Sequence, residues 1–327
     1  MTDRNYSFLY KNCTLCPRKC GADRTNKETG VCAMSDTLMV SRAALHMWEE
    51  PCISGKEGSG TVFFSGCNMH CIFCQNYEIS GNGSHLGKSA PDSTKASMST
   101  ICGKQISTER LADIFLSLES KGANNINLVT PTHFVPSVAE ALMLSKDRGL
   151  DIPVVYNTSG YELPETLAVL DGLIDVYLPD FKYMRSETAL HFSKCPDYPD
   201  VAKVAIKEMF RQAGEPVFED NGLIKKGVIV RHLILPGHTN EAKEIISYLY
   251  DTYGDSVYLS LMSQFTPIGE NLDKCASYPE LSRKVSKREY EKVVTFALEK
   301  GVKNGFTQEG KAALESFIPS FKDCEGV

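Results

Sequence analysis

The sequence has no long hydrophobic run, no surplus of positive charge and no internal repeat. No stretch approaches the roughly 18 apolar residues of a membrane helix, and no apolar segment follows a charged start at the N-terminus. Lysine and arginine number 35 against 41 acidic residues, a formal charge of −6, so no global positive field attracts nucleic acid. We therefore expect a cytoplasmic protein that acts on neither membranes nor, as its main partner, nucleic acid.

Cysteine, by contrast, is abundant. The chain has 327 residues, 42% of them hydrophobic, which suffices for one large core with an appendage, and 12 are cysteines. Seven cysteines form two groups: Cys13, Cys16, Cys20 and Cys32, then Cys67, Cys71 and Cys74. Because disulfide scaffolds are normally short and secreted, this clustering indicates metal binding rather than disulfides. The five scattered cysteines are expected to be free thiols.

Short β-rich apolar runs alternate with longer stretches of helical spacing from residue 61 onward. Strands are predicted at 61–65, 126–130, 154–157, 174–178, 228–235 and 257–261. Helices are predicted at 108–121, 135–148, 163–170, 240–252 and 287–300. This alternation indicates a parallel sheet. Because the strands fall short of the eight of a complete TIM barrel, the predicted fold class is α/β, a partial, open (β/α)6 TIM-like barrel.

Two segments depart from this alternation. Residues 1–35 have no repeating apolar pattern and are punctuated by Cys, Pro, Gly and basic residues, which predicts a small cysteine-rich unit that needs a metal to fold. We assign residues 36–327 to the barrel. Within it, 80–107 is rich in Gly, Ser and Lys and is predicted to be a surface loop or lid.

The strongest functional signal is GCNMHCIFCQN, where Cys67, Cys71 and Cys74 form a CxxxCxxC pattern directly after the predicted strand TVFFS. The cysteines therefore lie at the carboxyl end of a barrel strand, where active-site loops begin. Three thiolates this close together can bind one face of a [4Fe–4S] cluster and leave one iron without a protein ligand. An open iron is a site for chemistry, whereas structural zinc normally has a closed ligand set. A zinc knuckle or a redox thiol cluster is the alternative.

This triplet at the end of a first strand resembles that of the radical S-adenosylmethionine (radical SAM) superfamily. The segments EEPCISGKEGSGTVFFSGCNMHCIFCQNYEIS, LVTPTHFVP, YNTSGYE, YLPDFKY, RHLILPG and LMSQFTP are similar, in this order, to PflX-type relatives of pyruvate formate-lyase activating enzyme. The resemblance covers essentially the whole chain. It implies that the open iron chelates S-adenosylmethionine (SAM), which is cleaved reductively to a 5′-deoxyadenosyl radical that abstracts hydrogen from a substrate. The protein then contributes binding, orientation and exclusion of water.

The resemblance also implies cofactor contacts outside the cysteines. Phe73, directly before the last cysteine, corresponds to a position near the adenine. Asn157 and Ser159 match a polar motif that contacts the ribose or carboxylate. Asp180 and Lys182, in the motif DFK, match the DxK signature of glycyl-radical activating enzymes, and strand alternation puts both on one face. Further polar contacts are expected at Arg231, His232 and Gln264. Turns, salt bridges or packing are the alternatives at these positions.

One motif departs from the family pattern. After the second predicted strand, activating enzymes have a Gly-Gly-Glu motif that grips the amino group of the cofactor, whereas this chain reads Thr130, Pro131, Thr132 and His133. Any grip on that amino group must come from threonine hydroxyls, backbone carbonyls or another segment. This weakens the prediction of the substrate more than that of the cofactor. His133 is a proton-handling or a structural histidine.

The first cysteine group lies in CTLCPRKCGADRTNKETGVC and supplies enough thiolates to close a tetrahedral site. Zinc fits four closed ligands, while a second iron–sulfur cluster would suit a radical enzyme that needs an auxiliary electron path or a substrate anchor. The residues do not decide between them. Four basic side chains would offset the negative charge of either site: Arg18, Lys19, Arg24 and Lys27.

Several functions compete at this point. The leading one is hydrogen abstraction from a peptide or protein, with a backbone glycine of a partner enzyme as one candidate, driven by a low-potential electron donor such as flavodoxin or ferredoxin. Radical modification of RNA or a small molecule is a second. An iron–sulfur electron carrier or sensor that does not cleave SAM is a third, although carriers usually have complete ligation. A zinc-dependent interaction module is a fourth.

Overall fold

The computed structural model describes residues 6–81, 101–267, 275, 277–308, 319–321 and 323–327. Most of the predicted lid at 80–107 lies outside these residues. The described strands form a ten-stranded sheet. Its members are β1 (Met39–His46), β2 (Ser59–Phe64), β3 (Lys104–Gln105), β4 (Ile126–Val129), β5 (Val154–Thr158), β6 (Val176–Pro179), β7 (Val217–Phe218), β8 (Ile224–Leu233), β9 (Tyr258–Met262) and β10 (Gly305–Thr307).

The sheet is open and mostly parallel. Its order is β10-β9-β8-β6-β5-β4-β2-β1-β3, with β7 paired to β8 beside this path. All neighbours from β2 to β10 along this path run parallel. Only β1 reverses direction, pairing antiparallel with β2 and β3. The predicted partial barrel is confirmed, since the edge strands β3 and β10 do not pair within the part of the chain that the structure describes.

Each strand predicted from the sequence is present, with bounds that differ by a few residues. The short strands β3, β7 and β10, and the longer β1, were not predicted. Strands of two or three residues carry too little pattern to be recognised in a sequence. β1 lies between the cysteine-rich segment and the first predicted strand, and its apolar residues show no strict alternation with polar ones.

The α-helices are α1 (Pro51–Ser54), α2 (Thr108–Ser120), α3 (Val135–Asp147), α4 (Pro164–Leu167), α5 (Ser186–Ser193), α6 (Tyr198–Ala213), α7 (Thr239–Tyr253) and α9 (Lys287–Lys300). Short 3-10 turns lie at η1 (Ser7–Tyr10), η2 (Arg24–Asn26), η4 (Thr132–Phe134), η5 (Ala168–Leu170) and η6 (Pro279–Ser282). The sequence prediction missed the four-residue α1 and also α5 and α6. Two prolines interrupt the apolar pattern there, and the structure places Pro199 in the first turn of α6, where its missing N–H costs no helical hydrogen bond.

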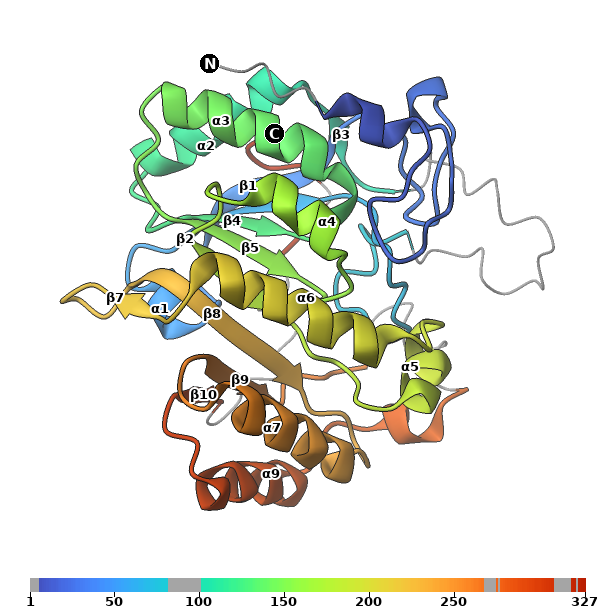
Figure 1. Ribbon diagram of the computed structural model, residues 1–327, viewed down its shortest axis with the longest axis vertical. Helices are drawn as coiled ribbons and strands as arrows, with labels where there is room; N and C mark the ends of the chain where they lie inside the picture. Colours follow the sequence, from blue (N-terminus) through green and yellow to red (C-terminus); the bar gives the residue numbers. More distant parts are fainter. Residues whose placement is uncertain (1–5, 82–100, 268–274, 276, 309–318, 322) are drawn as a thin grey trace.

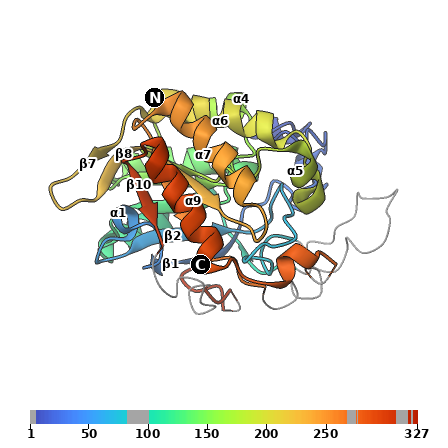
Figure 2. The ribbon, with the colours of Figure 1, turned by 90° about the horizontal axis from the view of Figure 1, so that it is seen from below.

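Helices cover the outer face of the sheet in chain order. Figure 1 shows α2 and α3 at one end, α4 and α6 over the centre, and α7 and α9 over the last strands. Figure 2 shows α7 and α9 side by side. Serine side chains cap two of these helices, because Ser107 accepts from Arg110 at the start of α2 and Ser286 forms a capping box with Glu289 in α9.

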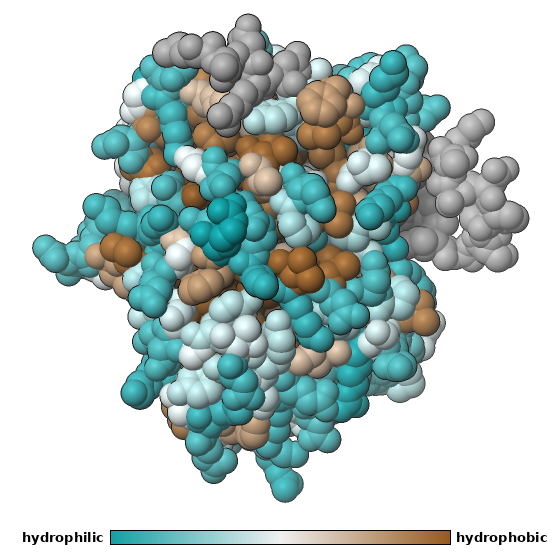
Figure 3. Space-filling view, in the orientation of Figure 1, coloured by the Kyte–Doolittle hydropathy of each residue, from teal (hydrophilic) through white to brown (hydrophobic). Residues whose placement is uncertain are grey.

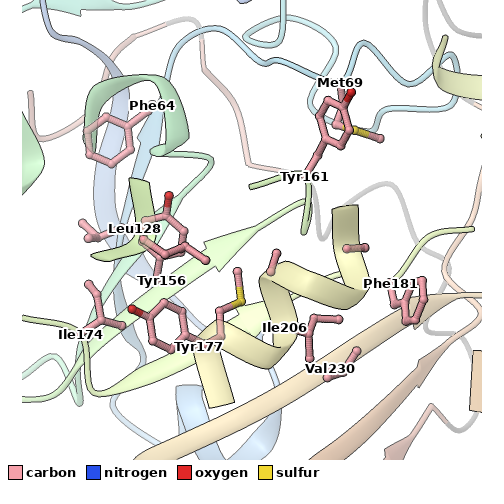
Figure 4. Close-up of a cluster of buried hydrophobic side chains, with 14 of the residues drawn as sticks. Phe64, Met69, Leu128, Tyr156, Tyr161, Ile174, Tyr177, Phe181, Ile206 and Val230 are labelled. Atoms are coloured by element: carbon pink, nitrogen blue, oxygen red, sulfur yellow. The ribbon is translucent and has the colours of Figure 1, made fainter. Parts of the chain in front are cut away.

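The parallel strands are buried on both faces, so they read as continuous apolar runs rather than alternating ones. On the outer face Tyr156 and Tyr177 meet edge to face at 5.8 Å, and Ile206 of α6 packs in the same core (Figure 4). On the inner face Ile53 of α1 packs in a second core with Val155 of β5. The inner core thus seals the barrel beneath the site described below.

The described surface has no extended apolar area on the face shown in Figure 3, where apolar side chains form small groups among hydrophilic ones. No helix of the described residues has the length and apolar content needed to cross a bilayer.

The inner core yields a stability prediction. Ile53 is fully buried, so Ile53→Ala removes apolar contacts and leaves a cavity. We expect the free energy of unfolding to fall by about 2–5 kcal/mol, measured by urea denaturation. Leu298 on α9 is 67% exposed, and Leu298→Ala serves as the control with an effect within about 0.5 kcal/mol. Equal effects of the two substitutions would contradict a packed inner core.

Candidate active site

A cavity of about 620 Å³ opens at the carboxyl ends of the parallel strands. Its walls are formed by the residues that follow successive strands: Cys67 after β2, Thr130 after β4, Ser159 after β5, Lys182 after β6 and Gln264 after β9. Such positions converge in an α/β barrel because all parallel strands end at one edge. The volume lies in the range of sites for small molecules and cofactors.

The thiols of Cys67, Cys71 and Cys74 all face this cavity. Burial, followed by the nearby Cys71 thiol, raises the pKa of Cys67 to about 11. Burial, followed by Cys67 and Cys71, raises the pKa of Cys74 to about 12. The three residues line one cavity, and neighbouring thiols of the triplet contribute to the raised pKa values of Cys67 and Cys74. A bound metal would favour their thiolate forms, and the neighbouring Lys182 ammonium stabilises negative charge there.

The cysteine loop is held in place from behind. Arg18 of the N-terminal unit donates to the carbonyl oxygens of Asn68 and Met69 at 2.9 and 3.4 Å, and to the sulfur of Cys195 at 2.8 Å. The Ser193 hydroxyl donates to Cys71 at 3.1 Å. Cys195 lies behind the loop and not among the described residues that line the cavity.

Phe73 occupies an aromatic wall of the cavity. Its ring meets those of Tyr183, Phe192 and Phe265 edge to face, with centroids 6.0–6.4 Å apart. These ring contacts fix the Phe73 side chain, which stands in the sequence between Cys71 and Cys74. A flat apolar surface next to the thiols is suited to contact with a purine ring.

A row of buried charges forms the inner wall of the cavity. Lys182 pairs with Asp180 at 2.5 Å, and Asp180 accepts from Arg231 at 2.9 Å. Arg231 also pairs with Glu49 at 3.3 Å and donates to the Asn157 oxygen at 2.7 Å. These four charged side chains are only 10–16% exposed. The sequence pattern placed Asp180 and Lys182 on one face, and the structure brings them together.

The charges in this row stabilise one another. Burial alone would raise the pKa of Asp180, but Arg231 and Lys182 outweigh it and hold the pKa below its usual value. Burial would lower the pKa of Lys182, whereas Asp180 and Cys71 raise it. For Glu49 burial prevails over the attraction of Arg231, and its pKa is raised. Asp180 and Lys182 are therefore fully charged at neutral pH.

The turn after β5 combines a cavity wall with a tight backbone contact. Asn157 and Ser159 both line the cavity, while the Ser159 oxygen also accepts weakly from the Tyr161 N–H at 3.4 Å. Gly160 has φ +77°, and a Cβ there would lie 2.3 Å from the Asp180 carbonyl oxygen. Only glycine fits, because both the left-handed backbone and the close approach exclude a side chain.

The segment after β4, Thr130–His133, has a strained start and is held by hydrogen bonds. Thr130 lines the cavity with φ +57°, which is rare for a β-branched residue. Thr132 instead points away and donates to the buried carboxylate of Glu162 at 2.5 Å. His133 is buried with Nε2 2.7 Å from the Ser65 carbonyl oxygen, and it does not line the cavity in the described residues. This geometry is that of a structural histidine.

The four N-terminal cysteines also approach one another. The Cys13 and Cys20 thiols share a hydrogen bond, which lowers the pKa of Cys20 to about 5. A Cβ on Gly30 would lie 2.9 Å from the Cys20 sulfur and 3.6 Å from that of Cys32. Burial, followed by Cys32, raises the pKa of Cys16 to about 12. Among the described residues, however, no three His, Cys, Asp or Glu side chains are arranged so that they could hold a metal ion, in either cysteine group.

A buried arginine faces this group. Arg24 is 0% exposed and stacks on the Tyr10 ring at 4.6 Å. It donates to the carbonyl oxygens of Ser35 and His133, each at 2.6 Å, and to the Cys13 sulfur at 3.7 Å. No carboxylate of the described residues forms an ion pair with it. A buried guanidinium requires an anion nearby, so this residue fits a group of thiolates.

The comparison with protein families decides the identity of the fold and site. The family described as the radical SAM superfamily matches residues 61–249, more than half of the chain. The chain belongs to the radical SAM superfamily.

Two further proteins are similar to this radical SAM chain. The uncharacterized protein MJ0674 of Methanocaldococcus jannaschii is 30% identical over 293 residues, which cover 88% of this chain and 75% of that protein. The crystal structure of Streptococcus suis SuiB bound to precursor peptide SuiA aligns with a TM-score of 0.47 and 12% identity over 75% of this chain. The chain spans about half, 47%, of that structure's length. Membership of the superfamily indicates an enzyme that uses a [4Fe–4S] cluster and SAM.

Three positions of this radical SAM site differ from the sequence analysis. His232 faces away from the cavity, because its Nδ1 lies 2.8 Å from the Phe181 carbonyl oxygen and strand alternation turns it opposite to Arg231. Glu49 and Trp48 line the cavity but were not predicted. The pair Glu49-Glu50 directly before a buried apolar helix was the available signal, since acidic residues rarely enter a core without a function.

The buried His133 yields a pH prediction. Burial, followed by Arg24, lowers the pKa of His133 from 6.5 to about 3. A depressed pKa of a base stabilises the native state above the unfolded pKa, and this contribution is lost as pH falls through about 6.5 toward about 3. Over this window we expect wild type to lose on the order of 4 kcal/mol more stability than His133→Asn, measured by urea denaturation.

The exposed Leu298 provides the control. Leu298→Ala removes no titrating group, so its stability should follow that of wild type at each pH. Parallel curves for wild type and His133→Asn would show that His133 is not held neutral by its surroundings.

Proposed function

We propose that this radical SAM enzyme cleaves SAM reductively at Cys67, Cys71 and Cys74 and uses the resulting radical to abstract hydrogen from a peptide or protein substrate. The observation that carries the proposal is the convergence of three thiols on a large cavity at the strand ends. Three ligands leave one iron open, as SAM chelation requires. A carrier with complete ligation would need a fourth ligand there.

Cys67, Cys71 and Cys74 would hold the cluster, which would supply the electron for reductive cleavage of SAM and hence the radical that abstracts hydrogen from the substrate. The chain's own residues bind and orient. Phe73 offers an apolar face to the adenine, and Asn157 and Ser159 offer short hydrogen-bonding groups to the ribose or carboxylate. The Lys182 ammonium compensates negative charge at the thiolates.

Further polar groups complete the proposed cofactor end of the cavity. Gln264 lines it from the end of β9, where its Oε1 accepts from Gln308 at 3.0 Å. Asp180 and Arg231 hold the ammonium of Lys182 in position. In place of the Gly-Gly-Glu motif this chain has Thr130, which lines the cavity and has a left-handed backbone conformation.

We further propose that Cys13, Cys16, Cys20 and Cys32 bind a structural metal, either zinc or a second iron–sulfur cluster. The support is the buried Arg24, which has thiols in place of a carboxylate partner. The unit has only a small core of its own, formed by Tyr10, Cys13 and Leu15, so a metal would supply much of its stability.

The assignment to a PflX-type relative of pyruvate formate-lyase activating enzyme rests on the sequence motifs. It favours flavodoxin or ferredoxin as electron donor and a glycyl-radical-type partner enzyme as substrate. Modification of a peptide, RNA or small molecule is the second candidate, because the segment Thr130–His133 lacks the activating-enzyme motif.

Cys71→Ala tests the proposed chemistry. In anaerobic, reduced and iron-reconstituted protein supplied with SAM, wild type should form 5′-deoxyadenosine, and the variant should fall at least about 100-fold because the cluster loses one of three ligands. Product is quantified by liquid chromatography. Cys324→Ala, in neither cysteine group, should retain wild-type activity. Equal product from Cys71→Ala and wild type would refute the ligand assignment.

Cys20→Ser tests the N-terminal metal. Metal analysis of anaerobically purified wild type should show the iron of the triplet and a second metal, either zinc or the iron of a second cluster. Cys20→Ser should keep the iron of the triplet and lose the second metal. Because the unit has little core, its melting temperature should also fall by several degrees. Cys324→Ser is the matched control. A metal content unchanged by Cys20→Ser would rule out a metal held by this group.

A further inference from the structure

The end of α5 packs directly against the cysteine loop. The Phe192 carbonyl oxygen accepts from the Ile72 N–H at 3.0 Å, so the last turn of the helix is tied to the middle of the triplet. Arg18 also donates to the Ser193 carbonyl oxygen at 3.3 Å. These backbone contacts fix the position of Ser193, the last residue of α5, relative to Cys71.

A chain of hydrogen bonds leads from the cysteine loop into the core. The Ser193 hydroxyl donates to the Cys71 sulfur at 3.1 Å, and its oxygen lies 2.6 Å from the Tyr183 hydroxyl. Ser193 and Tyr183 are fully buried, and Cys71 is only 7% exposed. Bulk solvent therefore does not compete for these hydrogen bonds, which are stronger in such surroundings than in water.

The direction of the chain follows from the number of protons. A thiolate that ligates iron has no proton, so it only accepts, and Ser193 gives it its single hydroxyl hydrogen bond. The Ser193 oxygen is then left as an acceptor, and the Tyr183 O–H donates to it. Burial raises the pKa of Tyr183 well above its ordinary value, so the phenol keeps its proton. The hydrogen bonds therefore run from Tyr183 to Ser193 and from Ser193 to Cys71.

Such a chain favours electron uptake at the triplet. Reduction of a [4Fe–4S] cluster adds one negative charge, part of which lies on its thiolate ligands, so a hydrogen bond donated to a thiolate is stronger in the reduced state. Hydrogen bonds to the sulfur atoms are among the factors that set the reduction potential of these clusters. The Tyr183 hydroxyl adds to the effect, because hydrogen bonds in a chain polarise one another.

We propose that Ser193, supported by Tyr183, raises the reduction potential of the cluster at the cysteine triplet through its hydrogen bond to the Cys71 thiolate. This inference rests on the proposed function, because it requires a cluster at the triplet. One electron arrives from the low-potential donor of that function, and no proton moves. Ser193 and Tyr183 act through Cys71 and are positioning residues, which make the cluster easier to reduce.

Ser193→Ala tests the inference in a redox titration. Anaerobic, iron-reconstituted protein is poised at a series of potentials without SAM, and the electron paramagnetic resonance signal of the reduced cluster is measured. The signal that Cys71→Ala lacks belongs to the triplet and is the one followed. At a fixed potential, the ratio of reduced to oxidised cluster should be about tenfold lower in Ser193→Ala than in wild type, a midpoint shift of about −59 mV.

Three further variants separate the hydrogen bond from a structural effect. Tyr183→Phe keeps the bond from Ser193 to Cys71 and removes only its support, so the ratio should fall less, by about twofold. Ser193→Thr keeps the hydroxyl and should restore the wild-type ratio. Ser145 is the matched control, since it is equally buried near the end of α3 and donates to the Leu142 carbonyl oxygen at 3.0 Å. Ser145→Ala should leave the ratio unchanged.

The outcomes distinguish this inference from the proposed function. Equal midpoint potentials of wild type and Ser193→Ala, with the cluster present in both, would overturn the inference and leave the proposed function intact. If Ser193→Ala does not fold, equal potentials of wild type and Tyr183→Phe would overturn it instead. Wild type without iron at the triplet would overturn the proposed function, and this inference with it.

Discussion

The ion pairs around Arg231 determine the shape of the active site. One guanidinium joins Asp180 after β6, Asn157 at the end of β5 and Glu49 before α1, so it fixes three separate segments against β8. Burying one of these charges without its partners would cost several kcal/mol of folding free energy. Removal of one charged side chain therefore leaves its partners buried without compensation. Such a network restricts the barrel wall to one arrangement. It also lets a lysine remain charged beside the thiols despite its burial.

The sequence was most informative where a local pattern carries the structure. Continuous apolar runs located the parallel strands, and the spacing of Cys67, Cys71 and Cys74 located the candidate active site at the first strand end. Asp180 and Lys182, two residues apart directly after β6, were predicted to lie together and form an ion pair in the structure. These predictions succeed because they depend on residues that are close together along the chain.

The sequence was least informative where partners are distant along the chain. Glu49 lies 182 positions from Arg231, and nothing local links them. His232 was expected beside Arg231 in the site, but neighbouring residues of a strand point to opposite faces. Cys195 is a lone cysteine in the sequence, although the fold places it directly behind the cysteine loop at Met69. Long-range pairing of this kind depends on topology, which single-sequence periodicity does not contain.

The buried Arg24 links two parts of the protein that the sequence separates. It faces the Cys13 sulfur on one side and donates to the His133 carbonyl on the other, three residues from the cavity-lining Thr130. With neutral thiols beside it, the same guanidinium would be an uncompensated charge in the interior, next to the strained turn after β4. The charge state of the N-terminal thiols and the conformation of the turn after β4 are therefore coupled through this one guanidinium.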